Sequence, residues 1–177
     1  FDVAYQIFQG KLIYRDFFYA NFPLFPYISS LYYFLVGKNI ELFYITSSIE
    51  VVIISSIIYY ISYDKTKNAL ISFFSSIIYV FSFIVLSTSD HQTGVFTASL
   101  FAVLGYLFLH KKNFILSGVF VALSFFTKAY FIPIIISFFI YLFLQKNYKH
   151  AVHFTITFLA TCLIIVLPFL LLAQKEF

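Results

Sequence analysis

The chain has 177 residues, of which 62% are hydrophobic, 24% are aromatic and only 10% are charged, with a formal net charge of +4. A soluble domain carries about 25% charged residues, so this chain cannot cover a globule with polar surface and the soluble class is excluded. The basic residues are scattered at the ends of apolar runs, which excludes a nucleic-acid-binding patch. We therefore predict an all-α, polytopic transmembrane helical bundle.

The first segment, Phe1 to Tyr27, is the one long stretch dense in polar side chains. Its charged residues are Asp2, Lys11, Arg15 and Asp16. A charged loop beside membrane-like sequence is a candidate active-site loop. The next stretch, Pro23 to Gly37, is apolar but shorter than the roughly 20 residues of a full span. It favours a juxtamembrane helix, with a tilted span as the alternative.

Apolar runs joined by short polar links make up the rest of the chain. Four runs are interpreted as single spans, at residues 40–62, 69–86, 95–109 and 151–173. The run 114–144 is broken at Lys128 and Pro133, so it forms either one long span or two short ones. Two spans place the Lys-rich links 63–68, 110–113 and 145–150 on one side, which the positive-inside rule assigns to the cytoplasm. We prefer that topology, with tilt or bilayer thinning accommodating the short halves.

This topology predicts a single transmembrane domain over residues 1–177. Residues 1–39 form a large extracytoplasmic loop with a juxtamembrane helix, and residues 40–177 form about six membrane helices. Lys128 and the link 87–94 fall on the same extracytoplasmic side as the first loop. The chain begins at Phe1, has no Met and ends directly after an apolar run, so we expect a fragment of a longer protein.

An ordered set of motifs runs through most of the chain. It comprises Asp2, Tyr5, Gly10, the YRDF stretch 14–17, the prolines and aromatic helix ending at Gly37, Asp90, and the GVFVALSFFTK stretch 118–128. In this order the motifs resemble the N-terminal half of integral-membrane glycosyltransferases of the GT-C class. Those enzymes are the relatives of protein O-mannosyltransferases and of the aminoarabinose transferase that modifies lipid A.

The resemblance implies an inverting transfer of a sugar from a polyprenyl-phosphate carrier to an acceptor hydroxyl. The acceptor is a lipid, a glycan or a protein, and the reaction takes place on the extracytoplasmic face of a multi-pass protein of the prokaryotic plasma membrane. The resemblance makes Asp2 the general base, although Val3 follows it where the family often has Glu. Asp90 positions the acceptor or assists the base. No cofactor is implied.

The chemistry of the residues supports these roles independently. A carboxylate within about 3 Å of a sugar hydroxyl accepts its proton as the new bond forms. A lipid-phosphate leaving group needs positive charge, which the Arg15 fork and the Lys128 ammonium supply. Tyr14 offers a ring that stacks on a sugar, and we assign Asp16 and His91 to substrate binding as well.

Each of these residues also has a structural interpretation. In this interpretation Asp2 is a helix cap or a solvated acid, and Asp90 caps the next span. Arg15 and Asp16 form a local ion pair in this interpretation. Lys128 extends to the headgroups, and Tyr14 belongs to the aromatic belt at the interface.

Glu50 and His91 raise two further questions. Glu50 lies well inside a span, where a charged acid costs about 2.5–3.5 kcal/mol, so we expect a buried structural hydrogen bond there. His91 beside Asp90 is not a metal-ligand set by itself, so no metal requirement is predicted. The alternative function is a transporter or flippase for a lipid-linked or polar solute, in which Glu50 is the functional acid.

Overall fold

The computed structural model describes residues 1–89, 92–146 and 148–172. Within these ranges every regular element is helical, and an isolated bridge between Ile13 and Phe17 is the one β-type pairing. The elements are α1 (Asp2–Phe8), α2 (Leu24–Val36), α3 (Ile40–Thr66), α4 (Ala69–Val80), α5 (Phe83–Thr88), α6 (Val95–His110), α7 (Phe114–Thr127), the 3-10 turn η1 (Ala129–Phe131), α8 (Ile132–Leu144) and α9 (Tyr148–Leu172). The predicted all-α class is confirmed.

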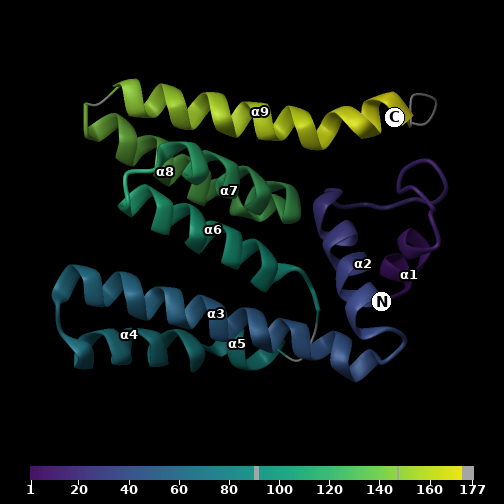
Figure 1. Cartoon of the computed structure of the whole chain (residues 1–177), viewed down its shortest axis with the longest axis horizontal. Helices are drawn as coiled ribbons and strands as arrows, with labels where there is room; N and C mark the ends of the chain where they lie inside the picture. The colour runs from purple at the N-terminus through teal and green to yellow at the C-terminus, as the bar shows by residue number, and fades with distance from the viewer. Residues whose placement is uncertain (90–91, 147, 173–177) are drawn as a thin grey trace.

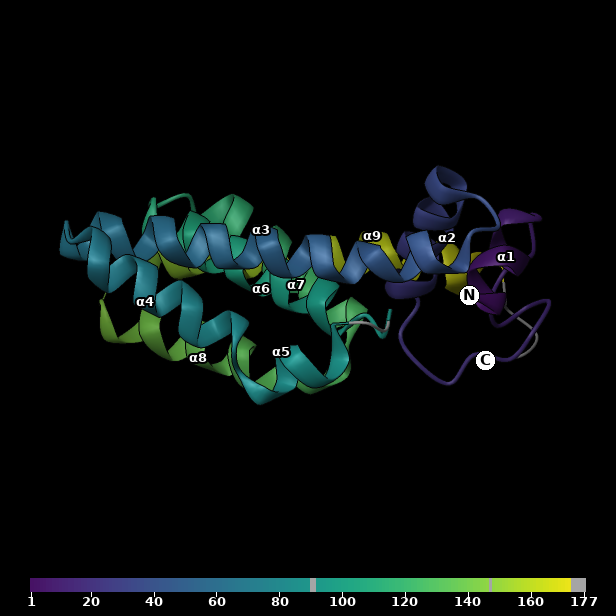
Figure 2. The ribbon, with the colours of Figure 1, turned by 90° about the horizontal axis from the view of Figure 1, so that it is seen from below.

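Two helices of the described ranges are long and apolar enough to cross a membrane by length and composition, namely α3 with 27 residues and α9 with 25. The other apolar helices have 10–17 residues. Figure 1 shows α3, α4 with α5, α6, α7, α8 and α9 running back and forth between the same two ends. In both views α1 and α2 lie at one of these ends (Figures 1 and 2).

The structure corrects two boundaries expected from the sequence. The single span predicted at 69–86 is interrupted, because α4 ends at Val80 and the backbone of Ser82 is extended (φ −66°, ψ 145°) before α5 begins. Ser82 occupies the N-cap position of α5, and its side chain makes no capping hydrogen bond there. The first segment is not a loop throughout, because Asp2–Phe8 forms α1. Burial drives this helix: Ala4 is 1% exposed, and the Phe1 ring packs edge-on against Tyr33 and Phe43.

The predicted break in the run 114–144 is confirmed. Lys128 has an extended backbone (φ −149°, ψ 122°) that ends α7, and α8 begins beyond the short turn η1. Pro133 lies in the first turn of α8, where its missing N–H leaves no hydrogen bond unmade. Lys128 therefore stands at the tip between two short helices.

The packing of α6, α7 and α9 depends on small residues. A Cβ added at Gly118 of α7 would lie 2.6 Å from the Phe154 carbonyl oxygen of α9, so the two backbones are in close contact there. On the other side of α7, the Ser117 hydroxyl donates to the Gly105 carbonyl (2.9 Å) and the Ser124 hydroxyl donates to the Ala98 carbonyl (2.8 Å). In a bilayer the lipid tails are as apolar as the side chains, so the hydrophobic effect does not drive helices together. Close packing at small residues and interhelical hydrogen bonds of this kind hold them together instead.

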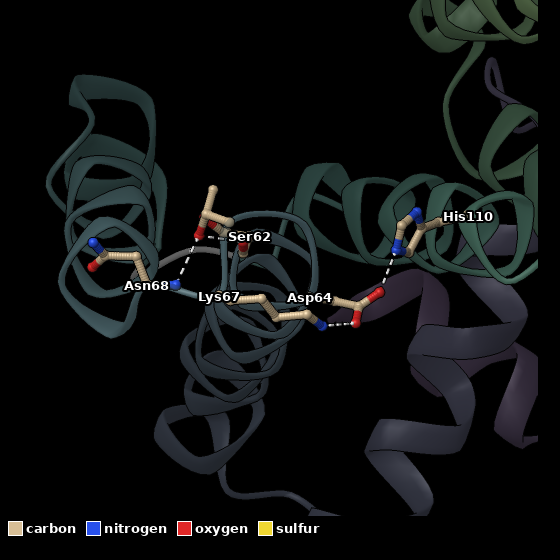
Figure 3. Close-up of polar contacts among 6 residues, drawn as sticks. Ser62, Asp64, Lys67, Asn68 and His110 are labelled. Carbon is tan, nitrogen blue, oxygen red and sulfur yellow. Dashed lines mark hydrogen bonds and ion pairs between the residues drawn. The ribbon is translucent and has the colours of Figure 1, made fainter.

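Polar contacts join the helix ends opposite α1 and α2. Asp64 near the end of α3 lies 2.7 Å from His110 Nε2 at the end of α6, and its other oxygen pairs with Lys67 at 2.7 Å (Figure 3). Phe114 at the start of α7 stacks on His150 near the start of α9, with ring centroids 4.0 Å apart. The basic links thus gather at one end of the helices, as the two-span interpretation predicted.

Candidate functional site

The segment between α1 and α2 is a folded turn built around Asp16. The Asp16 carboxylate accepts the backbone N–H of Leu12 (2.8 Å), and the Tyr14 N–H donates to the Phe17 carbonyl (3.0 Å). Tyr14 itself has φ 66°, a left-handed backbone that is rare for residues other than glycine. These contacts direct the Tyr14, Arg15 and Asp16 side chains into one cavity.

Arg15 and Asp16 form a bidentate pair. Arg15 Nε lies 2.9 Å from Oδ1 and Nη2 lies 2.8 Å from Oδ2. The hydrogen bonds from Arg15, with that from the Leu12 amide, lower the pKa of Asp16 to about 2. The same pair raises the pKa of Arg15. At neutral pH the pair is fully ionised, and Asp16 is a very weak base.

The cavity, which we call the polar cavity, has a volume of about 990 Å³. Residues 14–23 form one wall, residues 126–130 at the break between α7 and α8 form another, and α9 contributes the rest. Its polar side chains include Tyr14, Arg15, Asp16, Tyr19, Asn21, Thr127, Lys128 and Tyr130. Residues more than 100 positions apart in the sequence therefore meet in one space.

Aromatic contacts hold the walls of the polar cavity together. The Phe22 ring packs on Phe125 and Phe126 of α7, with centroid distances of 4.9 and 5.5 Å. The Tyr14 ring meets Phe169 of α9 edge-on at 5.7 Å. The Tyr14 hydroxyl donates to the Asn21 carbonyl, and burial raises its pKa to about 12, so it stays protonated.

Lys128 is the second cation of the polar cavity. Its Nζ lies 5.6 Å from the centre of the Phe25 ring at the start of α2, a cation–π geometry. Burial lowers the pKa of the ammonium. Among the described residues Lys128 forms no ion pair, so an anion that enters the cavity meets an uncompensated positive charge.

A second cavity of about 340 Å³, which we call the apolar groove, adjoins the first. Arg15, Pro23 and Phe169 line both spaces. The other side chains of the groove are Leu12, Ile13, Leu24, Tyr27, Ile164, Ile165, Pro168 and Leu172. A charged chamber thus opens beside a hydrocarbon-lined one, and Arg15 lines both.

The structure brings together four of the seven predicted site residues: Tyr14, Arg15, Asp16 and Lys128. Asp2 lies in the first turn of α1, is exposed, and is not among the residues that line either cavity. The predicted convergence of Asp2 with Lys128 in one cavity is therefore not found. Asp90 and His91 lie outside the described residues. Among the described residues no cluster of three or more His, Cys, Asp and Glu could hold a metal.

Sequence reasoning missed the contribution of α9. Val166 and Phe169 complete the polar cavity, and Ile164, Ile165 and Pro168 complete the apolar groove. Pro168, inside the C-terminal part of α9, was the available signal. Glu50 has the buried structural hydrogen bonds that the sequence predicted, being 3% exposed and bonded to Tyr32 and Thr97.

Comparison with known families decides what kind of protein carries these cavities. The model of the dolichyl-phosphate-mannose-protein mannosyltransferase family matches residues 21–172. The chain belongs to this family. The matched range includes Lys128, α9 and most of both cavities, and it confirms the resemblance to glycosyltransferases of the GT-C class. This mannosyltransferase-family chain is thus a glycosyltransferase. Comparisons with curated proteins and with solved structures found no match.

Proposed function

We propose that this mannosyltransferase-family chain transfers a sugar from a polyprenyl-phosphate carrier to an acceptor hydroxyl, with inversion at the anomeric carbon. The observation that carries the proposal is the pair of adjoining cavities. The polar cavity holds Arg15 and Lys128, and the apolar groove begins at the same Arg15. A lipid-linked phosphate has this combination of an anionic head and a hydrocarbon tail.

Arg15 and Lys128 bind the phosphate in this proposal. At an effective dielectric constant of about 20, two unit charges about 4 Å apart attract by about 4 kcal/mol. Among the described residues no carboxylate pairs with Lys128, so its ammonium is available to the phosphate. Arg15 is half-exposed and paired with Asp16, but three of its five N–H donors are free to face a phosphate.

The isoprenoid tail lies in the apolar groove against α9. The groove opens between the first segment and the C-terminal part of α9, whose Ile164 and Leu172 are exposed on the apolar surface of the bundle. A tail that leaves the groove at this point continues directly into lipid. The sugar then lies in the polar cavity, where the aromatic residues Tyr14, Phe18 and Tyr19 offer ring faces.

Asp2 is the general base in the proposal, Asp90 positions the acceptor or assists the base, and His91 belongs to the substrate-binding residues. Asp16 lies nearer the two cations but is unsuited to the role, because Arg15 and the Leu12 amide occupy its oxygens and hold its pKa at about 2. The Asp2 carboxylate is exposed and belongs to the same N-terminal segment as Arg15. An acceptor hydroxyl must therefore approach from the side of α1.

We propose that the six helical passes among the described residues between 40 and 172 cross the prokaryotic plasma membrane as one domain with the segment 1–39. The end of the helices that carries Lys65, Lys67, Lys111 and Lys112 faces the cytoplasm, because loops rich in Lys and Arg prefer the cytoplasmic side of a membrane. The polar cavity, at the opposite end, faces the extracytoplasmic side. The alternative of a transporter is disfavoured because Glu50, its functional acid, lines neither the polar cavity nor the apolar groove.

Reconstitution in liposomes tests the function directly. The protein is supplied with a panel of polyprenyl-phosphate sugars and an acceptor mixture, and the release of lipid phosphate is measured with the glycosylated product. We expect both to appear together, and an Asp2→Asn variant to lose turnover while it retains donor binding. Wild-type turnover in Asp2→Asn would remove the base assignment. Solute flux without lipid-phosphate release would replace the transferase proposal with the transporter.

A further inference from the structure

Glu50 is a buried acid at the junction of three helices and belongs to neither cavity. It lies 10 positions into α3 from its first helical residue, about 15 Å along the axis, and it is 3% exposed. Its Oε1 accepts the Tyr32 hydroxyl of α2 at 2.7 Å and the Thr97 hydroxyl of α6 at 2.6 Å. The bond from the Tyr32 hydroxyl joins α2 to α3.

The surroundings of the second carboxyl oxygen, Oε2, indicate the charge state of Glu50. Oε2 is buried and has no hydrogen-bond partner, and within the described ranges no Lys, Arg or His pairs with this side chain. An ionised carboxylate with one bare oxygen and no cation is among the most unfavourable groups to bury. A proton on Oε2 removes the charge and leaves Oε1 as a neutral carbonyl acceptor for both hydroxyls.

We propose that Glu50 is a protonated carboxylic acid that acts as a positioning residue, holding α2 in the place that both cavities require. Pro23 directly precedes α2 and lines the polar cavity and the apolar groove. Phe25, in the first turn of α2, lies under the Lys128 ammonium. A shift of α2 therefore moves the wall of both cavities and the ring beside the second cation. The positioning role rests on the proposed function; the protonated state does not.

Infrared spectroscopy of the protein in liposomes tests the protonated state without any assay of activity. We expect a carboxylic C=O band that shifts in D2O and is absent from the Glu50→Gln variant. Asp64→Asn, which alters an exposed and ion-paired carboxylate, is the matched control and leaves that band unchanged. A wild-type spectrum without such a band would show an ionised Glu50 and overturn the proposal.

Donor kinetics test the positioning role. Glu50→Gln keeps an acceptor oxygen for Tyr32 and is expected to keep wild-type KM and kcat. Glu50→Leu and Tyr32→Phe break the link to α2 and raise the donor KM on the order of tenfold, with a smaller change in kcat. Thr97→Val removes the other hydroxyl from the same oxygen but leaves the link to α2, so its donor KM stays near that of the wild type. Equal effects of Thr97→Val and Tyr32→Phe would overturn the role.

A distance measurement separates failure of this inference from failure of the proposed function. Spin labels at Phe34 of α2 and Val52 of α3, both exposed, report the placement of α2 in a Cys162→Ser background. We expect the distance distribution to broaden in Glu50→Leu and to remain narrow in Glu50→Gln. An unchanged distribution in Glu50→Leu would overturn the inference whatever the enzyme assay shows.

Discussion

Replacing Gly118 by alanine is expected to push α7 and α9 apart and to weaken donor binding at the same time. The new Cβ would lie 2.3 Å from Thr157 Oγ1, 2.6 Å from the Phe154 carbonyl oxygen and 3.1 Å from the Phe158 nitrogen. The Thr157 side chain can rotate away, but the other two atoms belong to the backbone of α9. The helices must therefore separate.

The size of the effect follows from two opposing contributions. Overpacking a close contact lowers the free energy of unfolding by about 1–3 kcal/mol, and alanine in a helix recovers about 0.5–1 kcal/mol relative to glycine. We expect a net loss of between about 0 and 2.5 kcal/mol, centred on about 1 kcal/mol. Thr127 at the end of α7, Lys128 directly after it, and Phe169 of α9 all line the polar cavity. Separation of α7 from α9 is therefore expected to widen that cavity.

Thermal unfolding in detergent and the donor KM measure the two consequences. Gly105→Ala is the matched control. Its Cβ would lie 2.8 Å from a side-chain methyl of Val121, while the nearest backbone atoms lie at 3.5 Å, an ordinary contact distance, so its effect is expected to be smaller. The double variant Gly118→Ala with Thr157→Ala should recover only part of the lost stability. Full recovery would show that the backbone contact with Phe154 does not limit the packing of α7 against α9, contrary to this prediction.

Three further predictions concern the polar cavity. Lys128→Gln is expected to raise the donor KM on the order of tenfold or more, whereas Lys128→Arg should retain most donor binding. Titration with the donor measures both, and equal effects of the two variants would exclude a role for the charge. Gly94 has φ 80°, and a Cβ added there would lie 2.6 Å from the Phe25 ring. Gly94→Ala should therefore lower the free energy of unfolding by about 1–3 kcal/mol and weaken donor binding. An unchanged unfolding midpoint would contradict the close contact with Phe25. Because the Asp16 pKa is depressed to about 2, the stabilisation by its pair with Arg15 is present above the ordinary carboxyl pKa of about 4 and is lost only as pH falls through about 2. A pH profile of the donor KM for wild type and Asp16→Asn should therefore show no step from this group between about pH 5 and 8, and a step that Asp16→Asn removes would refute the assignment.

The helical class, the break at Lys128 and the gathering of the basic links could be predicted from the sequence because they have local causes. Apolar runs of sufficient length form helices, Pro133 restricts the backbone near the break, and Lys-rich links mark helix ends. The helix α1 was missed because the polar residues of the first segment drew the interpretation away from Ala4, whose burial becomes visible only when Tyr33 and Phe43 are in place.

The amino-acid sequence alone showed which residues carry charge and where most of the long apolar helices lie, and it marked Arg15, Asp16 and Lys128 as candidates. That these three residues share a cavity, that Phe169 of α9 helps to line it and that Asp2 does not became visible only once the helices were packed. The physical reason is the uniform apolarity of the helices. When lipid-facing and protein-facing sides are equally hydrophobic, no periodicity reveals which side packs inward, and that choice rests on long-range contacts such as Gly118 against Phe154 and Tyr32 against Glu50.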